Sequence, residues 1–262
     1  MNPSHVRAIS PRRRRILVTN DDGYFSDGIN ALFAELSRKH EVYMVAPDRE
    51  QSASSHSLTL NHPLRIHRLD KYRYATDGTP TDCVMLGIHL LFKKRKLDMI
   101  VSGINHGGNM GDDVTYSGTI AAAIEGAILG IPSLAVSMAN YEPGMSMVRA
   151  ARFVNSLINS HPSLDLKPST FLNINLPPDN GRAYKRIKFT LQGVRHYKDI
   201  IVQKTDPRGK SYYWIGGKPT WRYTEGSDFD AIERGQVSIT PMKLEFTDSE
   251  ALDRLSAMRF KL

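Results

Sequence analysis

The chain has 262 residues, enough for one large domain or for one domain with an appended lobe. Hydrophobic residues make up 40% and charged residues 24%, a composition that excludes a wholly disordered chain. The single cysteine, Cys83, excludes an intramolecular disulfide and a cysteine-based zinc site, and we expect it to pack in the core. No apolar run approaches the roughly 20 residues of a membrane span.

Most of the net charge of +8 lies at the amino terminus. Residues 1–15 contain Arg7 and Arg12 to Arg15 but no acidic residue. This basic extension is either a solvated tail or a contact for nucleic acid or an anionic surface. It lacks the interleaved aromatic residues of a base-stacking surface, so we favour the solvated tail and expect no nucleic-acid partner. The three apolar residues that follow are too few for a signal peptide, so we expect a cytoplasmic protein that makes no membrane contact.

Strand-like and helix-like segments alternate through the first half of the chain. In chain order, the sequence predicts a strand at 16–19, a helix at 28–40, a strand at 42–46, a helix at 79–92, a strand at 98–102, a helix at 117–129 and a strand at 133–137. Thr79 is the expected N-cap of the second helix, with Pro80 at its first position. This alternation predicts an α/β fold, a Rossmann-like open and mainly parallel sheet with helices on both faces.

The second half has a different character. We expect a helix at 147–159, a strand at 170–175, a helix at 228–235, a strand at 237–239 and a terminal helix at 248–258. Residues 185–225 are rich in aromatic and β-forming residues, and Gly216-Gly217 predicts a hairpin turn between two such runs. Exposed tyrosine and tryptophan favour an oligomerisation arm over a substrate flap. The predicted organisation is a basic extension (1–15) and a single α/β domain (16–262), which comprises a catalytic half (16–140) and hairpin and C-terminal oligomerisation elements (185–262).

Oxygen-bearing side chains follow three of the predicted strands. Asp21 and Asp22 follow the first strand, Ser52 lies beyond the second, and Asn105 lies just after the third. In an open parallel sheet, ligands bind outside the carboxyl ends of the strands, so these residues are expected to meet. Adjacent carboxylates repel unless a cation or an arginine neutralises them. An all-oxygen set favours Mg²⁺, Mn²⁺ or Ca²⁺ over zinc, although the acidic pair alone also fits a simple helix-capping turn.

A glycine-rich segment at 103–111 leads to a predicted helix start at Ser117-Gly118-Thr119. The segment lacks the Gly-Lys-Ser/Thr ending of a P-loop and the spacing of a dinucleotide fingerprint. A helix start with small side chains can bind an anion, and the plainer interpretation is an ordinary Ser117 N-cap. A cation site beside an anion site suggests metal-assisted phosphoryl transfer to water, with Asp21 or Asp22 orienting or deprotonating that water.

Two other uses of acidic residues are less consistent with the sequence. A response-regulator receiver needs a lysine after its last parallel strand, and residues 136–140 contain none. Haloacid-dehalogenase phosphatases use Asp-x-Asp for covalent catalysis, whereas this chain has adjacent aspartates. A covalent aspartyl phosphatase and a nucleotide- or RNA-binding module with a degenerate site remain as alternatives.

Four ordered blocks of sequence resemble the SurE family of survival proteins, the stationary-phase 5′/3′-nucleotidases. They are residues 16–23 (ILVTNDDG), residues 45–59 from Val-Ala-Pro-Asp-Arg to Ser-Leu-Thr, residues 78–84 (GTPTDCV), and residues 101–119 from Val-Ser-Gly-Ile-Asn to Tyr-Ser-Gly-Thr. The resemblance covers residues 16–138 and fades beyond about residue 140.

The resemblance implies a metal-dependent phosphohydrolase of nucleoside 5′- and 3′-monophosphates, active also on short polyphosphate. It implies one divalent ion, Mn²⁺ or Mg²⁺, and a homodimer or homotetramer that exchanges C-terminal elements. By motif position, the metal ligands would be Asp21, Asp22, Ser52 and Asn105, with Asp21 and Asp22 also catalytic. The phosphate and substrate residues would be Asn20, Gly23, Asn109, Ser117, Gly118 and Thr119. His106 could reach a substrate phosphate, but it is not assigned a catalytic role.

Overall fold

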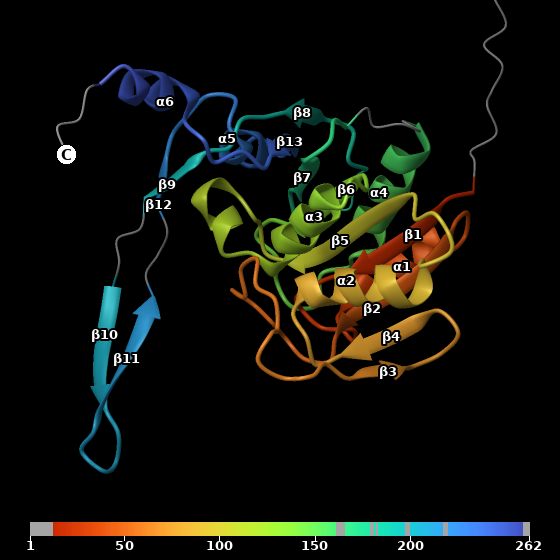
Figure 1. Cartoon of the computed structure of the whole chain (residues 1–262). Helices are drawn as coiled ribbons and strands as arrows, with labels where there is room; N and C mark the ends of the chain where they lie inside the picture. Colours follow the sequence, from red (N-terminus) through yellow and green to blue (C-terminus); the bar gives the residue numbers. More distant parts are fainter. Residues whose placement is uncertain are drawn as a thin grey trace, which may run out of the picture.

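The computed structural model describes residues 13–160, 166–178, 181, 183–196, 200–216 and 220–258. Its central layer is a nine-stranded sheet with the order β3-β4-β2-β1-β5-β6-β7-β13-β8 (Figure 1). The strands of this sheet are β1 (Arg15–Thr19), β2 (Glu41–Pro47), β3 (Ile66–Arg68), β4 (Arg73–Thr76), β5 (Met99–His106), β6 (Ser133–Met138), β7 (Thr170–Leu176), β8 (Ile187–Phe189) and β13 (Val237–Lys243). The six strands from β4 to β7 in this order run parallel, whereas β3 and β13 run antiparallel to their neighbours β4 and β7.

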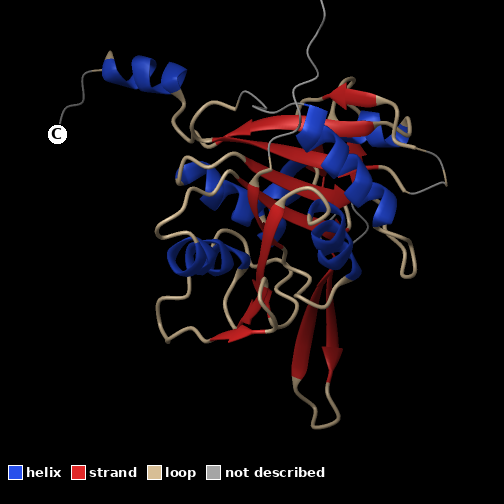
Figure 2. Cartoon of the chain, turned by 90° about the vertical axis from the view of Figure 1, so that its right-hand side faces the viewer, coloured by secondary structure: helices blue, strands red, loops and turns tan. Residues whose placement is uncertain are grey.

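Helices cover both faces of the sheet, as Figure 2 shows. Helices α1 (Asp27–Leu36) and α4 (Val148–Ser160) cover one face of the sheet. Their apolar side chains and those of that face form the largest apolar core cluster. Helices α2 (Pro80–Leu91) and α3 (Gly118–Ile128) cover the opposite face. Cys83 is fully buried on α2, as expected. The predicted α/β class, with a mainly parallel sheet between two helical layers, is therefore confirmed.

The predicted elements of the first half all form, with differences at their ends. Thr79 caps α2 as expected, and its hydroxyl accepts a hydrogen bond from the Asp82 backbone in a capping box. Helix α1 ends at Leu36, four residues before the predicted end, because the chain turns at 37–40 to enter β2. Strands β3 and β4 were not predicted from the sequence, since they are short and their outer residues are polar and partly exposed.

The order in which successive parallel strands are added to the sheet reverses at β1. Strand β2 lies on one side of β1 and β5 on the other, so the chain crosses from one half of the sheet to the other between them. A crevice opens outside the carboxyl ends of the strands at such a switch point, which is where ligands bind in open α/β sheets. The loops that follow β1, β2 and β5 therefore meet at one edge of the sheet.

An arm extends from the body of the molecule near its carboxyl end (Figure 1). Strands β10 (Ile200–Thr205) and β11 (Ser211–Gly216) form its antiparallel ribbon, and β9 (Val194–His196) pairs with β12 (Thr220–Arg222) at its base. The predicted turn at Gly216-Gly217 is wrong: Gly216 is the last residue of β11, and Gly217 lies outside the described residues. The ribbon turns instead at 206–210, where Asp206 accepts hydrogen bonds from the Arg208 and Lys210 backbones and Gly209 has φ +81°.

Two short helices complete the chain. Helix α5 (Asp228–Glu233) packs against β13, and helix α6 (Ser249–Ser256) begins after its N-cap Asp248. Figure 1 shows α6 beyond the edge of the body, on the side where the arm also lies. Within the described ranges, none of the helices combines the length and the apolar character that a bilayer crossing requires.

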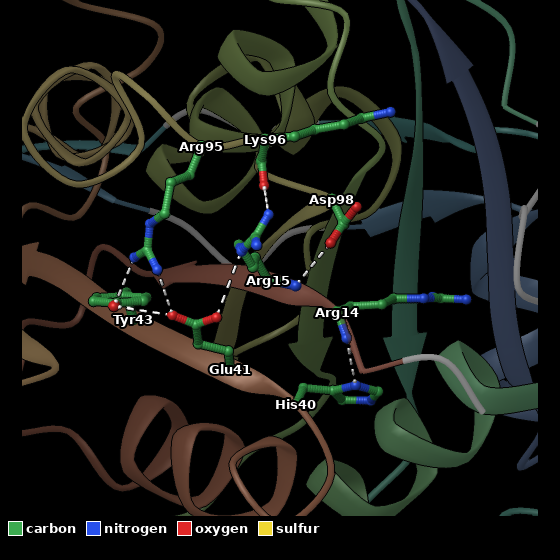
Figure 3. A network of polar contacts seen from close by, with 8 residues as sticks. All are labelled: Arg14, Arg15, His40, Glu41, Tyr43, Arg95, Lys96 and Asp98. Atoms are coloured by element: carbon green, nitrogen blue, oxygen red, sulfur yellow. Dashed lines mark hydrogen bonds and ion pairs between the residues drawn. The ribbon is translucent and has the colours of Figure 1, made fainter. Parts of the chain in front are cut away.

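The amino ends of β1, β2 and β5 lie at the edge of the sheet opposite the crevice described above. A network of charged residues lies there (Figure 3). Arg15 donates its backbone N–H to Asp98 (2.9 Å) and its Nε lies 3.5 Å from a Glu41 oxygen. Arg95 donates to Glu41 (2.9 Å) and to the Tyr43 hydroxyl (2.8 Å). Arg15 begins β1 and Arg14 is buried, so the solvated interpretation is wrong for these two residues. Arg13 is exposed, and residues 1–12 lie outside the described part of the chain.

Candidate active site

A cleft of about 740 Å³ opens at the carboxyl edge of the sheet, beside β1 and β5. Six of the residues predicted for the site line it: Asp21, Asp22, Ser52, Asn105, Asn109 and Ser117. They come from four separate stretches of chain, which the crossing at β1 brings to one place. The geometry therefore gathers side chains that lie up to 96 positions apart in the sequence.

The acidic pair is held in position from several directions. The Thr119 hydroxyl donates a 2.5 Å hydrogen bond to Asp21 Oδ1, and the Gln51 backbone donates to the Asp21 carbonyl at 2.7 Å. The His106 backbone donates to Asp22 Oδ2 at 3.2 Å. The turn continues through Gly23, whose φ of +91° lies in the region that glycine adopts without steric cost. Each carboxylate thus accepts at least one hydrogen bond from the protein, and Asp22 Oδ1 also lies 3.8 Å from the His106 ring Nδ1.

Burial makes the pair costly to ionise in the absence of a cation. Burial raises the pKa of Asp21 to about 6, against the lowering effect of the Thr119 hydrogen bond, and the nearby Asp22 charge raises it further. Burial also raises the pKa of Asp22 to about 6, with Glu50 as a second acidic neighbour. A cation bound between the two groups would reverse this effect, because an opposite charge favours the ionised form.

The remaining predicted metal ligands lie on the other walls of the cleft. Asn105, in β5, donates its Nδ2 to the Gly107 carbonyl at 2.9 Å, which leaves its Oδ1 as the atom suited to a cation. Ser52 lies on the exposed loop after β2 and donates to Glu50 Oε1 at 2.6 Å. The ligand set thus offers two carboxylates, an amide oxygen and a hydroxyl.

The first turn of α3 packs directly against Asp21. Ser117 is the N-cap, and its hydroxyl accepts from the Ile120 backbone at 3.1 Å. A Cβ placed on Gly118 would lie 2.8 Å from Asp21 Cβ, 2.8 Å from Ser54 Oγ and 3.0 Å from Asp21 Oδ2. Only a glycine therefore allows the helix start to approach the carboxylate so closely. The N–H groups of this first turn carry the positive end of the helix dipole, and the Thr119 backbone also bonds the Asp21 carboxylate.

Four predicted residues lie behind the cleft wall. Asn20 is fully buried and donates to the Gly23 carbonyl and to Ser26 Oγ, both at 2.9 Å. Thr119 is also fully buried, with its hydroxyl on Asp21. Gly23 and Gly118 shape the backbone at the two turns described above. In this structure the four support the lining residues, and none of them is itself part of the lining.

Several cleft residues were not predicted from the sequence. They are Phe25, Ser26, Asp27, Glu50, Ala53, Gly108, Asp113 and Tyr116. Glu50 could have been suspected from its position in the loop that follows β2, and Asp27 from its position at the start of the helix that follows β1. His106 also lines the cleft, as its sequence position allowed: its ring stacks on Tyr141 at 4.3 Å, and burial lowers its pKa.

The charge of the cleft fits a divalent cation. Five acidic side chains line it, and the described lining contains no lysine or arginine. One of the five, Asp113, is paired with Arg195 from the base of the arm. No group of three His, Cys, Asp or Glu side chains with the geometry of a metal site occurs in the described ranges. The candidate set therefore relies on an amide and a hydroxyl oxygen beside the two carboxylates, and such hard oxygen donors are the kind that Mg²⁺ and Mn²⁺ prefer.

The family model described as Survival protein SurE matches residues 16–199. The chain belongs to the SurE family. It is 49% identical to the 5′-nucleotidase SurE of Geotalea uraniireducens (strain Rf4) over 242 residues, which cover 92% of this chain and 97% of that protein. The 5′-nucleotidase SurE of Geobacter metallireducens is 48% identical over 247 residues, 94% of this chain and 98% of the relative.

A solved structure extends the family relationship to three dimensions. The crystal structure of the SurE protein from Aquifex aeolicus aligns with a TM-score of 0.83 at 40% identity, covering 92% of this chain and 98% of that one. Both the SurE resemblance and the fold predicted from the sequence are thereby confirmed. The alignment with curated relatives also extends well past residue 140, where the motif resemblance fades.

Proposed function

We propose that this protein is a divalent-metal-dependent phosphohydrolase that removes phosphate from nucleoside 5′- and 3′-monophosphates and, as a further substrate, from short polyphosphate. One observation carries the proposal: a buried and a partly buried carboxylate lie beside an amide oxygen and a helix start in one acidic cleft. Curated relatives that align with more than nine-tenths of the chain are named 5′-nucleotidase SurE, which supports a nucleotidase.

In this proposal the cation is held by Asp21, Asp22, Ser52 and Asn105. Thr119 occupies Asp21 Oδ1, so Oδ2 remains for the ion. The His106 backbone occupies Asp22 Oδ2, so Oδ1, which lies 3.8 Å from the His106 ring Nδ1, remains for the ion. When bound, Mn²⁺ or Mg²⁺ neutralises phosphate charge and lowers the pKa of a water ligand. The close approach of α3 then brings the positive end of its dipole toward the phosphate oxygens.

The protein supplies the remaining steps from its own side chains. Asn109 and Ser117 line the cleft and would orient the phosphate. Asp21 and Asp22 would orient the attacking water and accept its proton. A general base must lie within hydrogen-bond reach of the proton that it accepts. Base discrimination is assigned to the loops around 54–80 and 106–116, which contribute Tyr116 at the cleft rim.

A phosphate-release screen tests this function directly. Nucleoside 5′- and 3′-monophosphates, polyphosphate and sugar phosphates are each supplied with Mn²⁺, Mg²⁺ or EDTA. We expect release from the nucleotides that stops with EDTA and returns with the metal. Asp21→Asn should abolish turnover, whereas Asp70→Asn, at the exposed turn between β3 and β4, should leave it unchanged.

Other outcomes of that screen would favour the alternatives. A phosphorylated aspartate trapped during turnover would indicate covalent catalysis. The absence of phosphate release with every metal would refute the proposed activity. In that case salt-sensitive RNA binding lost on deleting residues 1–15 would favour the nucleic-acid-binding module.

We also propose that the arm joins copies of the chain into a homodimer or homotetramer in the cytoplasm. The side chains of Tyr213, Trp214 and Ile215 are 60%, 64% and 87% exposed on β11. An isolated two-stranded ribbon is marginally stable in water, so these side chains need a partner surface. Sedimentation should show an oligomer for the full chain, and a monomer after Trp214→Ser and Ile215→Ser are combined. Cell fractionation tests the location.

A further inference from the structure

A row of buried polar side chains lies beneath the loop that carries Asn109. Strand β7 alternates, with Leu172, Ile174 and Leu176 in the main apolar cluster. Its other face carries Asn173 and Asn175, which are 1% and 0% exposed. The neighbouring strands continue this polar row with Ser137 on β6 and with Ser238 and Thr240 on β13.

The two asparagine amides bind the backbone of Asn109. Asn175 Oδ1 accepts from the Asn109 N–H at 2.9 Å, and Asn175 Nδ2 donates to the Asn109 carbonyl at 2.9 Å. Asn173 Nδ2 donates to the same carbonyl at 2.8 Å. Both main-chain polar groups of Asn109 are therefore bound by side chains from a strand 64 to 66 residues further along the chain.

The side chain of Asn109 is fixed in the same network. Its Nδ2 donates to Ser137 Oγ at 2.8 Å, and this leaves the second Nδ2 proton and the Oδ1 atom for the cleft. The next turn is held from the C-terminal region, where buried Asp228 accepts from the Gly111 backbone at 2.9 Å and Gln192 donates to the Gly111 carbonyl at 3.0 Å. The loop is thus held by side chains at two neighbouring points.

These asparagines serve both stability and geometry. Hydrophobic residues in their place would leave the N–H and C=O of the buried Asn109 without partners, which costs stability. A fully satisfied polar network does hold its members in one geometry. The network lies at the carboxyl edge of β6 and β7, and through Asn109 it reaches the cleft.

We propose that Asn175, assisted by Asn173, is a positioning residue that holds Asn109 in the orientation in which it binds substrate phosphate. This inference rests on the proposed function, since Asn109 is there a phosphate-binding residue. Asn175 is buried and does not line the cleft, so it acts only through Asn109. A displacement of about 1 Å in a positioned group can lower the rate about a hundredfold.

The test compares alanine substitutions at Asn175 and Asn173. Asn175→Ala removes both bonds to Asn109 and should lower kcat/KM for a nucleoside monophosphate about tenfold to a hundredfold. Asn173→Ala removes only one donor to the carbonyl and should have a smaller effect. The dissociation constant for Mn²⁺ should stay within about twofold of wild type, because the side-chain bonds of Asn175 and Asn173 to the loop go to Asn109 and not to the proposed metal ligands. A parallel loss of metal affinity would overturn the positioning role.

Asn155→Ala provides the matched control. Asn155 is a buried asparagine on α4 that donates to Glu35 at 3.0 Å, on the face of the sheet opposite α3. It should lower the thermal midpoint while leaving kcat/KM for folded protein unchanged. If Asn155→Ala reduced kcat/KM as much as Asn175→Ala does, general destabilisation would explain the loss and the proposal would fail.

Two further measurements keep the inference separate from the proposed function. In an Asn109→Ala background, Asn175→Ala should cause little further loss of kcat/KM, because the two substitutions act through one group. Independent, multiplicative losses would contradict the proposal. Hydrogen exchange of the Asn109 backbone amide needs no substrate and should be faster in Asn175→Ala than in wild type and in Asn155→Ala. Unchanged exchange would overturn the positioning role, whereas a wild-type protein without phosphatase activity would refute only the proposed function.

Discussion

Removing the charge of Asp21 should stabilise the metal-free protein while it abolishes turnover. The pKa of Asp21 is about 6 in the folded chain, raised mainly by burial, against an ordinary value of 3.8. Because the folded state holds this proton more tightly than the unfolded chain does, the unfolding free energy falls as the pH rises from about 4 to about 6. Above that range the ionised carboxylate opposes folding by about 3 kcal/mol.

Asp21→Asn removes this penalty and keeps the local hydrogen bond, since an amide oxygen also accepts from the Thr119 hydroxyl. Urea unfolding in EDTA at pH 7.5 should therefore show the variant more stable than wild type by up to about 3 kcal/mol. At pH 4.5 the difference should fall to about 1 kcal/mol, because the wild-type carboxyl is then largely protonated in the folded state and partly protonated in the unfolded state. The difference between the two proteins reports Asp21 together with its coupling to Asp22, as all other titrating groups are shared.

Manganese should reverse the order of stability at pH 7.5. A ligand that binds only the folded state stabilises it by mass action, so Mn²⁺ should raise the unfolding midpoint of wild type well above that of Asp21→Asn. Equal midpoints of the two metal-free proteins at pH 7.5, or a variant less stable than wild type, would refute the claim that the buried charge is held at a cost.

Three further predictions concern the support of the site. Gly118→Ala should lower kcat/KM about a hundredfold, because its Cβ would press on the Asp21 carboxylate, whereas Gly216→Ala, which meets nothing within 4 Å, should be neutral in the same assay. Thr119→Val should raise the pKa of Asp21 further, since the lost hydroxyl lowers it, and a rise in the acid limb of the pH–rate profile would show this. Asp228→Ala should cost about 3 kcal/mol or more in thermal unfolding, because three backbone N–H groups lose their acceptor; a loss below 1 kcal/mol would contradict this.

The sequence was sufficient to predict the edge of the sheet at which the site lies. Asp21 follows one buried apolar strand and Asn105 lies near the carboxyl end of another, and the rule for open parallel sheets brings such positions together without further information. The helix start at Ser117 was visible from the Ser-Gly-Thr segment and from the alanine-rich run after it. These signals are local, and local patterns are what a single sequence expresses most directly.

Contacts over long sequence separations could not be predicted in this way. The bond from Thr119 to Asp21 joins residues 98 positions apart, and the sequence instead suggested that Thr119 contacts phosphate. Asn173 and Asn175 looked like ordinary strand residues, since nothing in their spacing shows what lies above β7. The hairpin turn was misplaced because Gly216-Gly217 is a stronger turn signal than the segment at 206–210, where an aspartate caps the bend.

The amino edge and the carboxyl edge of the sheet use different side chains, so substitutions at one edge need not affect the other. At the amino edge, Arg15, Glu41 and Arg95 tie the first two strands to the segment before β5. At the carboxyl edge, the loops that leave the same strands carry the acidic pair and its neighbours. The two sets are separated by the length of β1 and share no side chain. Substitutions in the charged network at the amino edge can therefore change thermal stability without altering the candidate site at the carboxyl edge. The same separation is available to protein design.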